Sequence, residues 1–254
     1  MCGRFALTPT PEEVAAFFAL MDLESFPPRY NIAPTQPVLL VIDGPRREPG
    51  SNLPRRRAML VRWGLVPAWA KSPRDIPLLI NARAESAAGK PAFRNAMRHR
   101  RALIPASGFY EWRRGSGPKG NSQAFWMRPR DNGVIAFAAL METFAEPGGS
   151  EIDTGAILTT SASADIAAIH DRMPVVIAPR DFSRWLDCRD QEPRDVVDLL
   201  RGAPPGFFEP IPVSDGVNKV ANTGPEIQDR MDVPPSQPAT RPASIAAPAQ
   251  MKLF

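Results

Sequence analysis

The sequence predicts a single α+β domain, with an antiparallel β-sheet core flanked by short helices. Short runs of β-prone residues follow one another between turns rich in glycine and proline, a pattern typical of antiparallel hairpins. Short segments with helical apolar spacing separate some of these runs. A chain of 254 residues that is 43% hydrophobic can bury one large core, and we find neither an internal repeat nor a second domain in it.

The first strand and the first helix are predicted near the N-terminus. Residues 5–7 form a short apolar run, and residues 10–13, Thr-Pro-Glu-Glu, have the form of a capping box with proline at the first helical position. The helix that follows carries apolar side chains at i, i+3, i+4 and i+7, so we expect all of them in the core. These side chains are Val14, Phe17, Phe18 and Met21.

A long hairpin follows this helix. Residues 38–42 and 59–63 are the predicted strands, and the segment 43–58, rich in arginine, proline and glycine, is the predicted loop between them. Glycine and proline then punctuate residues 64–69, which predicts a second loop that presents aromatic surface.

Residues 80–85 alternate polar side chains with alanine. If this run is extended, Asn81, Arg83 and Glu85 lie on one face, because the side chains of a strand alternate with period two. Such a polar face backed by alanine is unusual for a strand of the core. A short basic helix is predicted for residues 92–100.

The middle of the chain predicts a series of antiparallel hairpins, with Glu111 in one of the strands. Phe109, Tyr110 and Trp112 surround this carboxylate in the sequence, and burial beside them would raise its pKa. Glycine-rich turns separate the strands. The predicted strands span 102–105, 107–112, 125–127, 134–140 and 156–159, and the turns lie at 115–121 and 147–149.

Short helices and one buried strand are predicted for the last third. His170 lies between a helix over 164–169 and a strand over 175–177, at a junction between elements where functional residues often occur. Two further helices are predicted after Pro179 and Pro193. Their apolar side chains are Phe182, Trp185 and Leu186 in the first, and Val196, Val197, Leu199 and Leu200 in the second.

The domain is expected to span residues 2–225, with 213–222 as its final ordered segment. Residues 233–254 contain five prolines and several alanines without apolar periodicity, so we expect a disordered tail there.

Composition excludes several classes of protein. No apolar stretch approaches the ~18 residues of a membrane span, and we find no signal peptide, so we expect a cytoplasmic protein without membrane attachment. The two cysteines, Cys2 and Cys188, and the two histidines are too few for a disulfide scaffold or a zinc cluster. We therefore expect no metal and no cofactor, and a structural or surface role for the Cys188 thiol.

The charge of the chain favours an anionic partner. The formal net charge is +4, the pI is about 9.4, and 26 of the 31 basic residues are arginine, whose guanidinium binds phosphate oxygens in pairs. A genome that prefers arginine codons would produce the same excess, so charge alone does not decide the partner.

The first four residues, Met1-Cys2-Gly3-Arg4, carry the clearest chemical signal. Removal of an initiator methionine requires a small second residue, and here it leaves Cys2 with a free α-amine beside its thiol. With ordinary pKa values of about 8 for the amine and about 8.5 for the thiol, both groups are partly nucleophilic at neutral pH. Such an aminothiol condenses with an aldehyde to a thiazolidine ring. A small buried cysteine that comes second by chance is the alternative.

Six motifs, in order, resemble those of the SRAP family, the SOS response-associated peptidases or abasic-site processing proteins. The resemblance runs from Cys2 to about Asn222 and implies a compact domain with a barrel-like antiparallel sheet. It also implies binding of single-stranded DNA and covalent capture of its abasic sites. The motifs are Cys2-Gly3-Arg4-Phe5, Asn31-Ile32-Ala33-Pro34, Trp63-Gly64-Leu65-Val66-Pro67, Asn81-Ala82-Arg83-Ala84-Glu85, Gly108-Phe109-Tyr110-Glu111-Trp112 and Ile169-His170-Asp171-Arg172-Met173-Pro174.

The resemblance further implies roles for single residues. Cys2 is the nucleophile, Asn81 and Glu111 flank it, and His170 completes the catalytic site. Some family members have two adjacent aromatic residues where this chain has Trp69 and then Ala70. The protein is expected to act as a monomer, in the cytoplasm and on the nucleoid when bound to DNA. The residues implied in DNA binding are Arg4, Arg83 and Arg172 at the phosphates, Trp69 at a base, and Pro34 and Thr159.

The chemistry of an abasic site suits these residues. Its sugar is mostly a closed hemiacetal, so opening it needs proton transfers, and dehydrating the carbinolamine needs an acid. Glu111 and His170 can supply both, while arginines hold phosphates without reading sequence and Trp69 can stack on an unpaired base. Each residue also has a purely structural explanation: Glu111 as a strand-edge carboxylate, His170 as a helix cap, Asn81 as a turn former and Trp69 as a core residue.

Two other functions are open at this stage. Class II glutamine amidotransferases also begin Met-Cys-Gly and attack an amide with the N-terminal cysteine, but we find no Asn-Gly-Asp stretch that would hold glutamine and no synthase domain. A non-catalytic binder of single-stranded DNA is the other alternative. The name peptidase fits a protein that cuts only the Met1-Cys2 bond, by itself or with the help of a methionine aminopeptidase.

Overall fold

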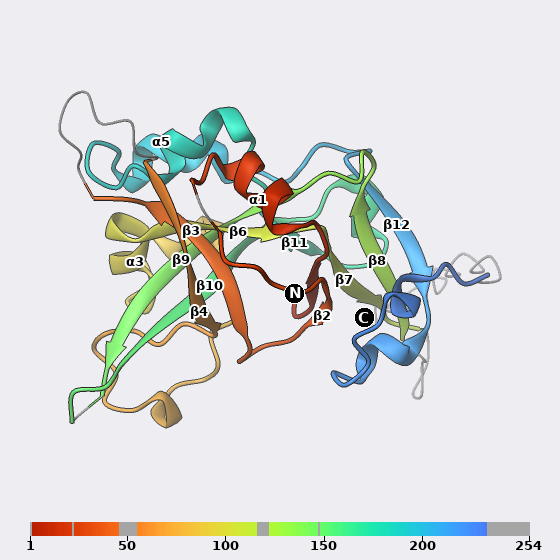
Figure 1. Ribbon diagram of the computed structural model, residues 1–254, viewed down its shortest axis with the longest axis horizontal. Coiled ribbons are helices and arrows are strands. Elements are labelled where there is room, and N and C mark those ends of the chain that lie inside the picture. Colours follow the sequence, from red (N-terminus) through yellow and green to blue (C-terminus); the bar gives the residue numbers. More distant parts are fainter. Residues whose placement is uncertain (1, 22, 46–54, 116–121, 147, 233–254) are drawn as a thin grey trace, which may run out of the picture.

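Two β-sheets form the centre of the protein in its computed structural model, which describes residues 2–21, 23–45, 55–115, 122–146 and 148–232 (Figure 1). The first sheet has five strands, and its order is β12-β8-β7-β1-β2. These strands are β1 (Phe5–Leu7), β2 (Arg29–Ile32), β7 (Gly108–Arg113), β8 (Gln123–Pro129) and β12 (Phe208–Val213).

The second sheet closes into a barrel. Its path runs β10-β4-β3-β6-β9, and β9 pairs with both β6 and β10, which joins the two ends of the path. The barrel strands are β3 (Pro37–Asp43), β4 (Arg56–Trp63), β6 (Arg101–Ala106), β9 (Ile135–Ala145) and β10 (Glu151–Ser161). The short strands β5 (Asn81–Arg83) and β11 (Arg172–Pro174) also pair with β10. The predicted α+β fold with a barrel-like sheet is confirmed.

Most neighbouring strands are antiparallel, as the hairpin pattern predicts, but β10 is an exception. It pairs in parallel with β4 at Thr154↔Arg62 and with β5 at Ile157↔Asn81. Parallel neighbours need a long connection along the chain, and adjacent turns cannot reveal them. The predicted antiparallel sheet therefore also contains parallel pairs at β10.

Aromatic side chains from both sheets meet in the core. Phe5 of β1 packs edge-to-face on Trp63 of β4 and on Phe137 of β9, with ring centroids 5.1 and 6.0 Å apart, and Phe109 of β7 also packs on Phe137 at 6.2 Å. All four rings are at most 1% exposed. Burial of such rings holds the first residues of the chain between the two sheets.

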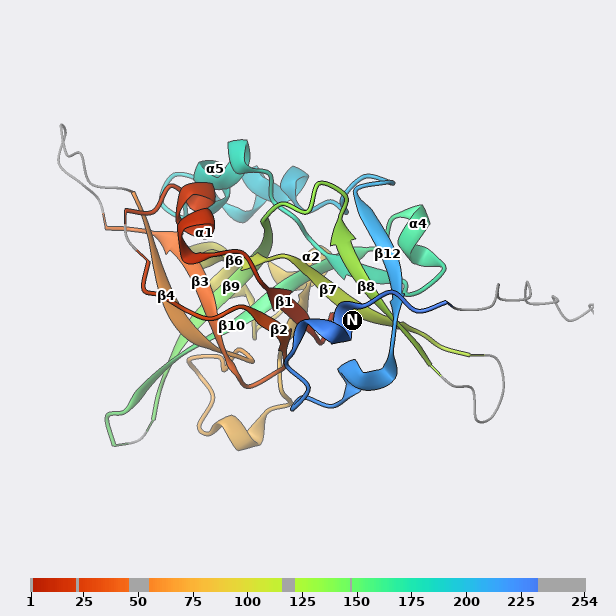
Figure 2. The same ribbon diagram turned by 45° about the vertical axis from the view of Figure 1, so that its right-hand side comes forward.

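Five short α-helices lie around the sheets in the described part of the chain. Helices α1 and α5 lie next to each other in both views, and their rings Phe18 and Phe182 stack at 5.0 Å (Figures 1 and 2). The bounds are α1 (Pro11–Phe18), α2 (Ala84–Ala87), α3 (Arg94–His99), α4 (Ala164–Ala167) and α5 (Phe182–Leu186); turns of 3₁₀ helix span Pro73–Asp75, Pro179–Asp181, Pro193–Leu199, Asp215–Asn218 and Pro225–Gln228. No described helix is long and apolar enough to cross a membrane.

Helix α1 begins as predicted and ends early. Thr10 and Glu13 form the capping box, and Pro11 is the first helical residue. Ala19 then adopts the left-handed conformation with φ of 51°, which ends the helix after Phe18. Met21 is therefore 67% exposed, and its predicted place in the core is wrong.

Other boundaries also differ from the sequence patterns. Helix α2 begins at Ala84, so Glu85 lies on a helix and does not share an extended face with Asn81. The short strand near residue 175 is Arg172–Pro174, and Val175 follows it as a buried residue. The last predicted helix is a 3₁₀ helix. A 3₁₀ helix repeats every three residues, and this repeat directs Val196 inward and leaves Val197 61% exposed.

Some predictions fall outside the described residues. They concern the central part of the 43–58 loop, most of the 115–121 turn and the tail 233–254. The described ends of the long hairpin pair as predicted, from Pro37↔Arg62 to Asp43↔Arg56.

A buried arginine connects β6 to the segment after α5. Arg101 is 1% exposed, and its guanidinium donates to four backbone carbonyls, those of Met97, Trp185, Asp187 and Gln191, at 2.6 to 3.0 Å. Its backbone N–H donates to Cys188 Sγ at 3.3 Å, which confirms a structural place for that thiol. Carbonyl oxygens therefore solvate this buried cation in place of water.

We expect Arg101→Ala to destabilise the protein strongly, because it leaves several buried carbonyls without a donor. The free energy of unfolding should fall by about 3 kcal/mol or more in urea denaturation. Arg98→Ala, which removes a 58%-exposed side chain of α3, is the control. Its effect should stay within about 0.5 kcal/mol, and equal effects of both variants would contradict the structural role of Arg101.

Candidate functional site

The site is built around Cys2, which is fully buried. Two contacts hold this end of the chain. Tyr110 N–H of β7 donates to the carbonyl of Arg4 at 2.9 Å, and Asn81 Nδ2 of β5 donates to the carbonyl of Cys2 at 2.8 Å. Both neighbouring strands therefore fix the backbone of the N-terminal residues.

Glu111 lies beside Cys2 because of the strand register. β1 and β7 pair at Phe5↔Phe109 and Ala6↔Gly108, and the antiparallel continuation of this register brings Glu111 next to the residues before β1. β7 starts at Gly108 with φ of 154°, where a Cβ would lie 2.3 Å from the carbonyl oxygen of Met127. Only glycine allows β7 to enter the sheet at this position.

The Glu111 carboxyl is protonated more readily than an ordinary glutamate. It is 2% exposed, and burial, the largest effect on this group, raises its pKa. The raised pKa predicted from the aromatic neighbours is therefore confirmed. The interpretation of Glu111 as a strand-edge carboxylate does not fit a side chain that the core covers.

His170 reaches the same place from the loop between α4 and β11. Its Nδ1 lies 3.9 Å from Glu111 Oε1 and 3.1 Å from Asp171 Oδ1, and the backbone N–H of Arg172 donates to Nδ1 at 3.0 Å. The structure thus brings together Cys2, Asn81, Glu111 and His170, the four residues that the sequence selected as catalytic candidates.

The Cys2 thiol differs from the sequence-based expectation. Burial raises its pKa far above the ordinary value, and the nearby Glu111 carboxylate raises it further. The thiol is therefore neutral at physiological pH, and the expectation of a partly ionised thiol is wrong. It can attack only after a neighbouring base has accepted its proton.

Two polar atoms near this site have no hydrogen-bond partner among the described residues. Asn81 Oδ1 and Thr159 Oγ1 are both buried. The parallel register of β5 and β10, with Ile157 beside Asn81 and Thr159 beside Arg83, places both residues on one face. Buried polar atoms are normally paired, so these two are candidates for contact with a ligand.

The three candidate arginines differ in their surroundings. Arg4 donates to Asn31 Oδ1 at 2.7 Å and to the carbonyl of Val217 at 2.6 Å. Arg172 forms a bidentate ion pair with Glu85 and is 13% exposed. Arg83 is exposed, and within the described ranges its side chain makes no hydrogen bond or ion pair. Of the three, only Arg83 offers an unoccupied guanidinium at the surface.

Trp69 and Pro34 lie on loops near the end of β4. Trp69 is 62% exposed, and its Nε1 donates to the carbonyl of Pro91 at 3.3 Å, so its interpretation as a core residue is wrong. Pro34 is half-buried in the turn after β2, and the next residue, Thr35, donates its N–H to the carbonyl of Trp63 at 2.8 Å. Both side chains are accessible to a ligand.

Asn31 has a structural role that the sequence did not reveal. It is 4% exposed, accepts from Arg4, and donates through Nδ2 to the carbonyls of Lys219 and Asn222 at 3.1 and 2.8 Å. Together with Arg4 it holds residues 217–222, in the part of the chain that is blue in Figure 1, beside the N-terminus. The motif at residues 31–34 marked this position without showing what it contacts.

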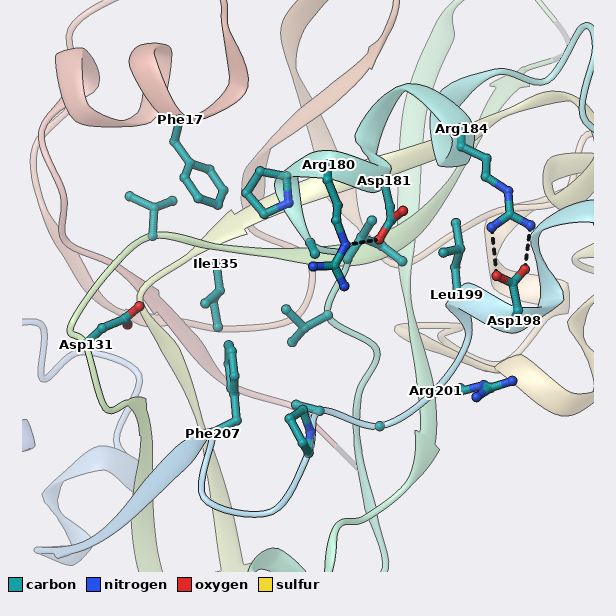
Figure 3. A pocket seen from close by; sticks show the side chains of 18 residues that line it. Phe17, Asp131, Ile135, Arg180, Asp181, Arg184, Asp198, Leu199, Arg201 and Phe207 are labelled. Atoms are coloured by element: carbon teal, nitrogen blue, oxygen red, sulfur yellow. Dashed lines mark hydrogen bonds and ion pairs between the residues drawn. The ribbon is translucent and has the colours of Figure 1, made fainter.

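A cavity of about 600 Å³ lies elsewhere, between α1, the start of β9 and the segments around residues 180 and 200 (Figure 3). None of the four catalytic candidates lines it. We also find no group of three or more His, Cys, Asp or Glu side chains suited to a metal ion in the ranges that the structure describes.

The fold and the site define a single-domain α+β protein with a buried cysteine at position 2 next to a carboxyl and an imidazole. Residues 1–220 match the family described as SOS response associated peptidase (SRAP), and the chain belongs to this family.

Several relatives share most of the chain. It is 34% identical over 230 residues to "Abasic site processing protein YoqW" of Bacillus subtilis (strain 168), which covers 89% of this chain and 98% of that protein. It is 34% identical over 236 residues to "Abasic site processing protein YedK" of Escherichia coli (strain K12), with 89% and 98% covered. A crystal structure of a Bacteroides thetaiotaomicron protein has the same fold, with a TM-score of 0.76, 21% identity, and 91% and 100% of the two chains covered.

We expect Glu111→Gln to stabilise the protein increasingly as the pH rises. At a pH between the unfolded-state pKa of about 4.3 and the raised folded-state pKa of Glu111, the unfolded chain releases a proton that the folded protein retains. The stability of the wild type therefore falls as the pH rises. Glutamine does not titrate. The gain in Tm of the variant over the wild type should therefore grow from pH 4.5 to pH 8.

Glu209→Gln is the control for this titration, because Arg128 lowers the pKa of Glu209. The folded state then favours the ionised form, so this variant should lose stability relative to the wild type as the pH rises from 3 to 5. A pH-independent difference for Glu111→Gln would show that burial does not raise the pKa of this carboxyl.

Proposed function

We propose that the protein captures abasic sites in single-stranded DNA as a covalent thiazolidine at Cys2, after removal of Met1. The observation that carries this proposal is the convergence of a buried N-terminal cysteine, a carboxyl of raised pKa and an imidazole. The names of the relatives, abasic site processing proteins, support the same substrate. We assign the whole activity to residues 2–225.

The reaction requires a free α-amine on Cys2. Hydrolysis of the Met1-Cys2 peptide bond consumes one water and releases methionine and the amine. This is the one peptidase step that the proposal includes. The protein or a methionine aminopeptidase can catalyse it, and the later chemistry is the same in both cases.

Ring opening of the abasic sugar comes first. The hydroxyl on C1′ loses a proton while the ring oxygen gains one, and the aldehyde is released. His170 is suited to move these protons, because the two ring nitrogens of an imidazole can donate and accept a proton. Its position on a loop, half-buried, leaves it accessible to the sugar.

Imine formation uses Glu111 as an acid. The amine of Cys2 adds to C1′ and gives a carbinolamine. The neutral Glu111 carboxyl donates its proton to the departing hydroxyl, which leaves as water and yields an iminium ion and a Glu111 carboxylate. The raised pKa of Glu111 keeps the carboxyl protonated more often near neutrality than an exposed glutamate.

Ring closure returns this proton to Glu111. The carboxylate takes the proton of the neutral Cys2 thiol, and the sulfur attacks the iminium carbon. The products are the neutral thiazolidine and the Glu111 carboxyl, so the acid is regenerated and one water is lost overall. The high pKa of the buried thiol makes this base necessary.

The strand of DNA is held mainly through its backbone. Arg83 is the exposed guanidinium closest in sequence to Asn81, and Trp69 offers a ring on which an unpaired base can stack. Asn81 Oδ1 and Thr159 Oγ1 can receive polar groups of the sugar. Pro34 adds apolar surface. Arg4 and Arg172 would have to give up internal contacts to bind phosphate.

We expect the purified protein to start at Cys2 and to form an adduct with abasic single-stranded DNA that survives denaturation. Cys2→Ala keeps the amine and should give at most an imine that needs a reductant to persist. Intact-mass spectrometry measures both forms. Cys188→Ala, which removes the other thiol, is the control and should form the adduct at the wild-type rate.

Different results would contradict different parts of the proposal. An equally durable adduct of Cys2→Ala without reductant would exclude the thiazolidine. Binding without any covalent product would favour the non-catalytic alternative. Release of ammonia from glutamine would favour the amidotransferase alternative, since the proposed reaction releases only water.

We expect affinity for single-stranded DNA to fall steeply with salt and to depend little on sequence. The log–log slope should be roughly −0.7 per neutralised phosphate. Arg83→Ala should make the slope shallower by about one phosphate contact, measured by fluorescence anisotropy over a salt series. Arg180→Ala removes an 86%-exposed guanidinium at the separate cavity and is the control, which should leave the slope unchanged.

A further inference from the structure

Glu85, the second residue of α2, forms a bidentate ion pair with the first residue of β11. Arg172 Nη1 donates to Glu85 Oε1 at 2.8 Å, and Arg172 Nη2 donates to Glu85 Oε2 at 2.9 Å. The hydrogen bonds from Arg172 hold the pKa of Glu85 below its usual value. Such planar, two-point pairing restricts the guanidinium in both position and orientation.

Arg172 is held from a second side as well. Its Nη2 also donates to the carbonyl of Thr159 on β10, and its side chain is only 13% exposed. Strand β11 has three residues, and Arg172↔Ser161 is the terminal pair of its ladder with β10. Terminal pairs of short strands fray easily, so the ion pair secures a position that the ladder alone holds weakly.

The backbone of Arg172 in turn contacts His170. Its N–H donates to His170 Nδ1 at 3.0 Å, and the same Nδ1 lies 3.9 Å from Glu111 Oε1. Asp171 Oδ1 and the carbonyl oxygen of Arg172 also lie near Nδ1, at 3.1 and 3.3 Å, so residues 171 and 172 together surround this edge of the ring. The place of Arg172 therefore determines the surroundings of Nδ1 and, through them, where the ring lies.

We propose that Glu85 is a positioning residue that acts through Arg172 on the imidazole of His170. The ion pair keeps the start of β11 in place, and the backbone of Arg172 then holds the imidazole ring in one orientation. Glu85 is 51% exposed, so the pair adds little to global stability, and its removal should act locally. The catalytic consequence rests on the proposed function, whereas the positioning itself does not.

Nuclear magnetic resonance of the free protein tests the positioning directly. The chain has two histidines, so the ring ¹⁵N signals of His170 and His99 are readily separated, and His99 on α3 serves as an internal reference. In Glu85→Gln the His170 ring signals should shift and broaden, because the ring samples more than one orientation, while those of His99 stay. Glu85→Asp, which keeps the charge, should restore the wild-type pattern in part.

Asp198→Asn is the matched control. It breaks another exposed bidentate pair, in which Arg184 donates to Asp198 at 2.6 and 2.7 Å, at the cavity in Figure 3. This variant should leave both histidine spectra and the rate of adduct formation unchanged. A shift of the His170 signals in Asp198→Asn as large as in Glu85→Gln would overturn the inference.

Adduct kinetics test the consequence for catalysis. Glu85→Gln should slow adduct formation on the order of tenfold, a part of the ~10²–10⁴-fold that general acid–base assistance supplies, without weakening DNA binding. In the His170→Ala background the same change should have no further effect, because the two residues act as one unit. If Glu85→Gln acted through a general loss of structure, it would slow adduct formation equally in the wild-type and in the His170→Ala background.

The outcomes separate this inference from the proposed function. If the wild type forms no adduct, the proposed function fails, and the His170 spectra still decide whether Glu85 positions the ring. If the wild type forms the adduct and Glu85→Gln has wild-type spectra and rates, only the positioning role fails. Tighter DNA binding by Glu85→Gln at an unchanged rate of adduct formation would also overturn the positioning role, since Glu85 would then only neutralise the charge of Arg172.

Discussion

Burial of the first residues between the two sheets is the constraint on which the rest of the site depends. Phe5 of the first sheet packs on Trp63 and Phe137 of the second, and this contact holds Cys2, three residues earlier, in a position without solvent contact. Desolvation then changes the chemistry of the two buried acids at this site. The carboxyl of Glu111 and the thiol of Cys2 both favour their neutral forms for this one reason.

The same burial explains why the site needs contacts from distant parts of the chain. Asn81 satisfies the carbonyl of Cys2, and Tyr110 satisfies that of Arg4, because a backbone away from water must find partners in the protein. Arg4 and Asn31 bind the segment after β12 to this end of the chain. The N-terminus is thus a central element of the fold, and a functional group placed there is held as firmly as one on a strand.

Arginines serve three different purposes in this protein. Arg101 is a structural cation solvated by carbonyls, Arg172 is a link between α2 and the His170 loop, and Arg83 is exposed and unoccupied within the described ranges. A basic composition alone therefore overstates the surface available to an anion. Only the side chains without internal partners can contribute to binding at no structural cost.

Local structure and the chemical identity of the site were determined by the sequence itself. The capping box at Thr10 and the hairpins around Glu111 depend on neighbours a few residues apart, so periodicity and turn chemistry predict them. The site residues from Cys2 to His170 follow instead from the resemblance of their motifs to those of the SRAP family. The early end of α1, the parallel pairing of β5 with β10, the high pKa of Cys2 and the ion pair of Glu85 were decided only by the tertiary structure. These features depend on strand register and burial, which arise from contacts between residues far apart in the chain, and no local pattern of side chains contains that information.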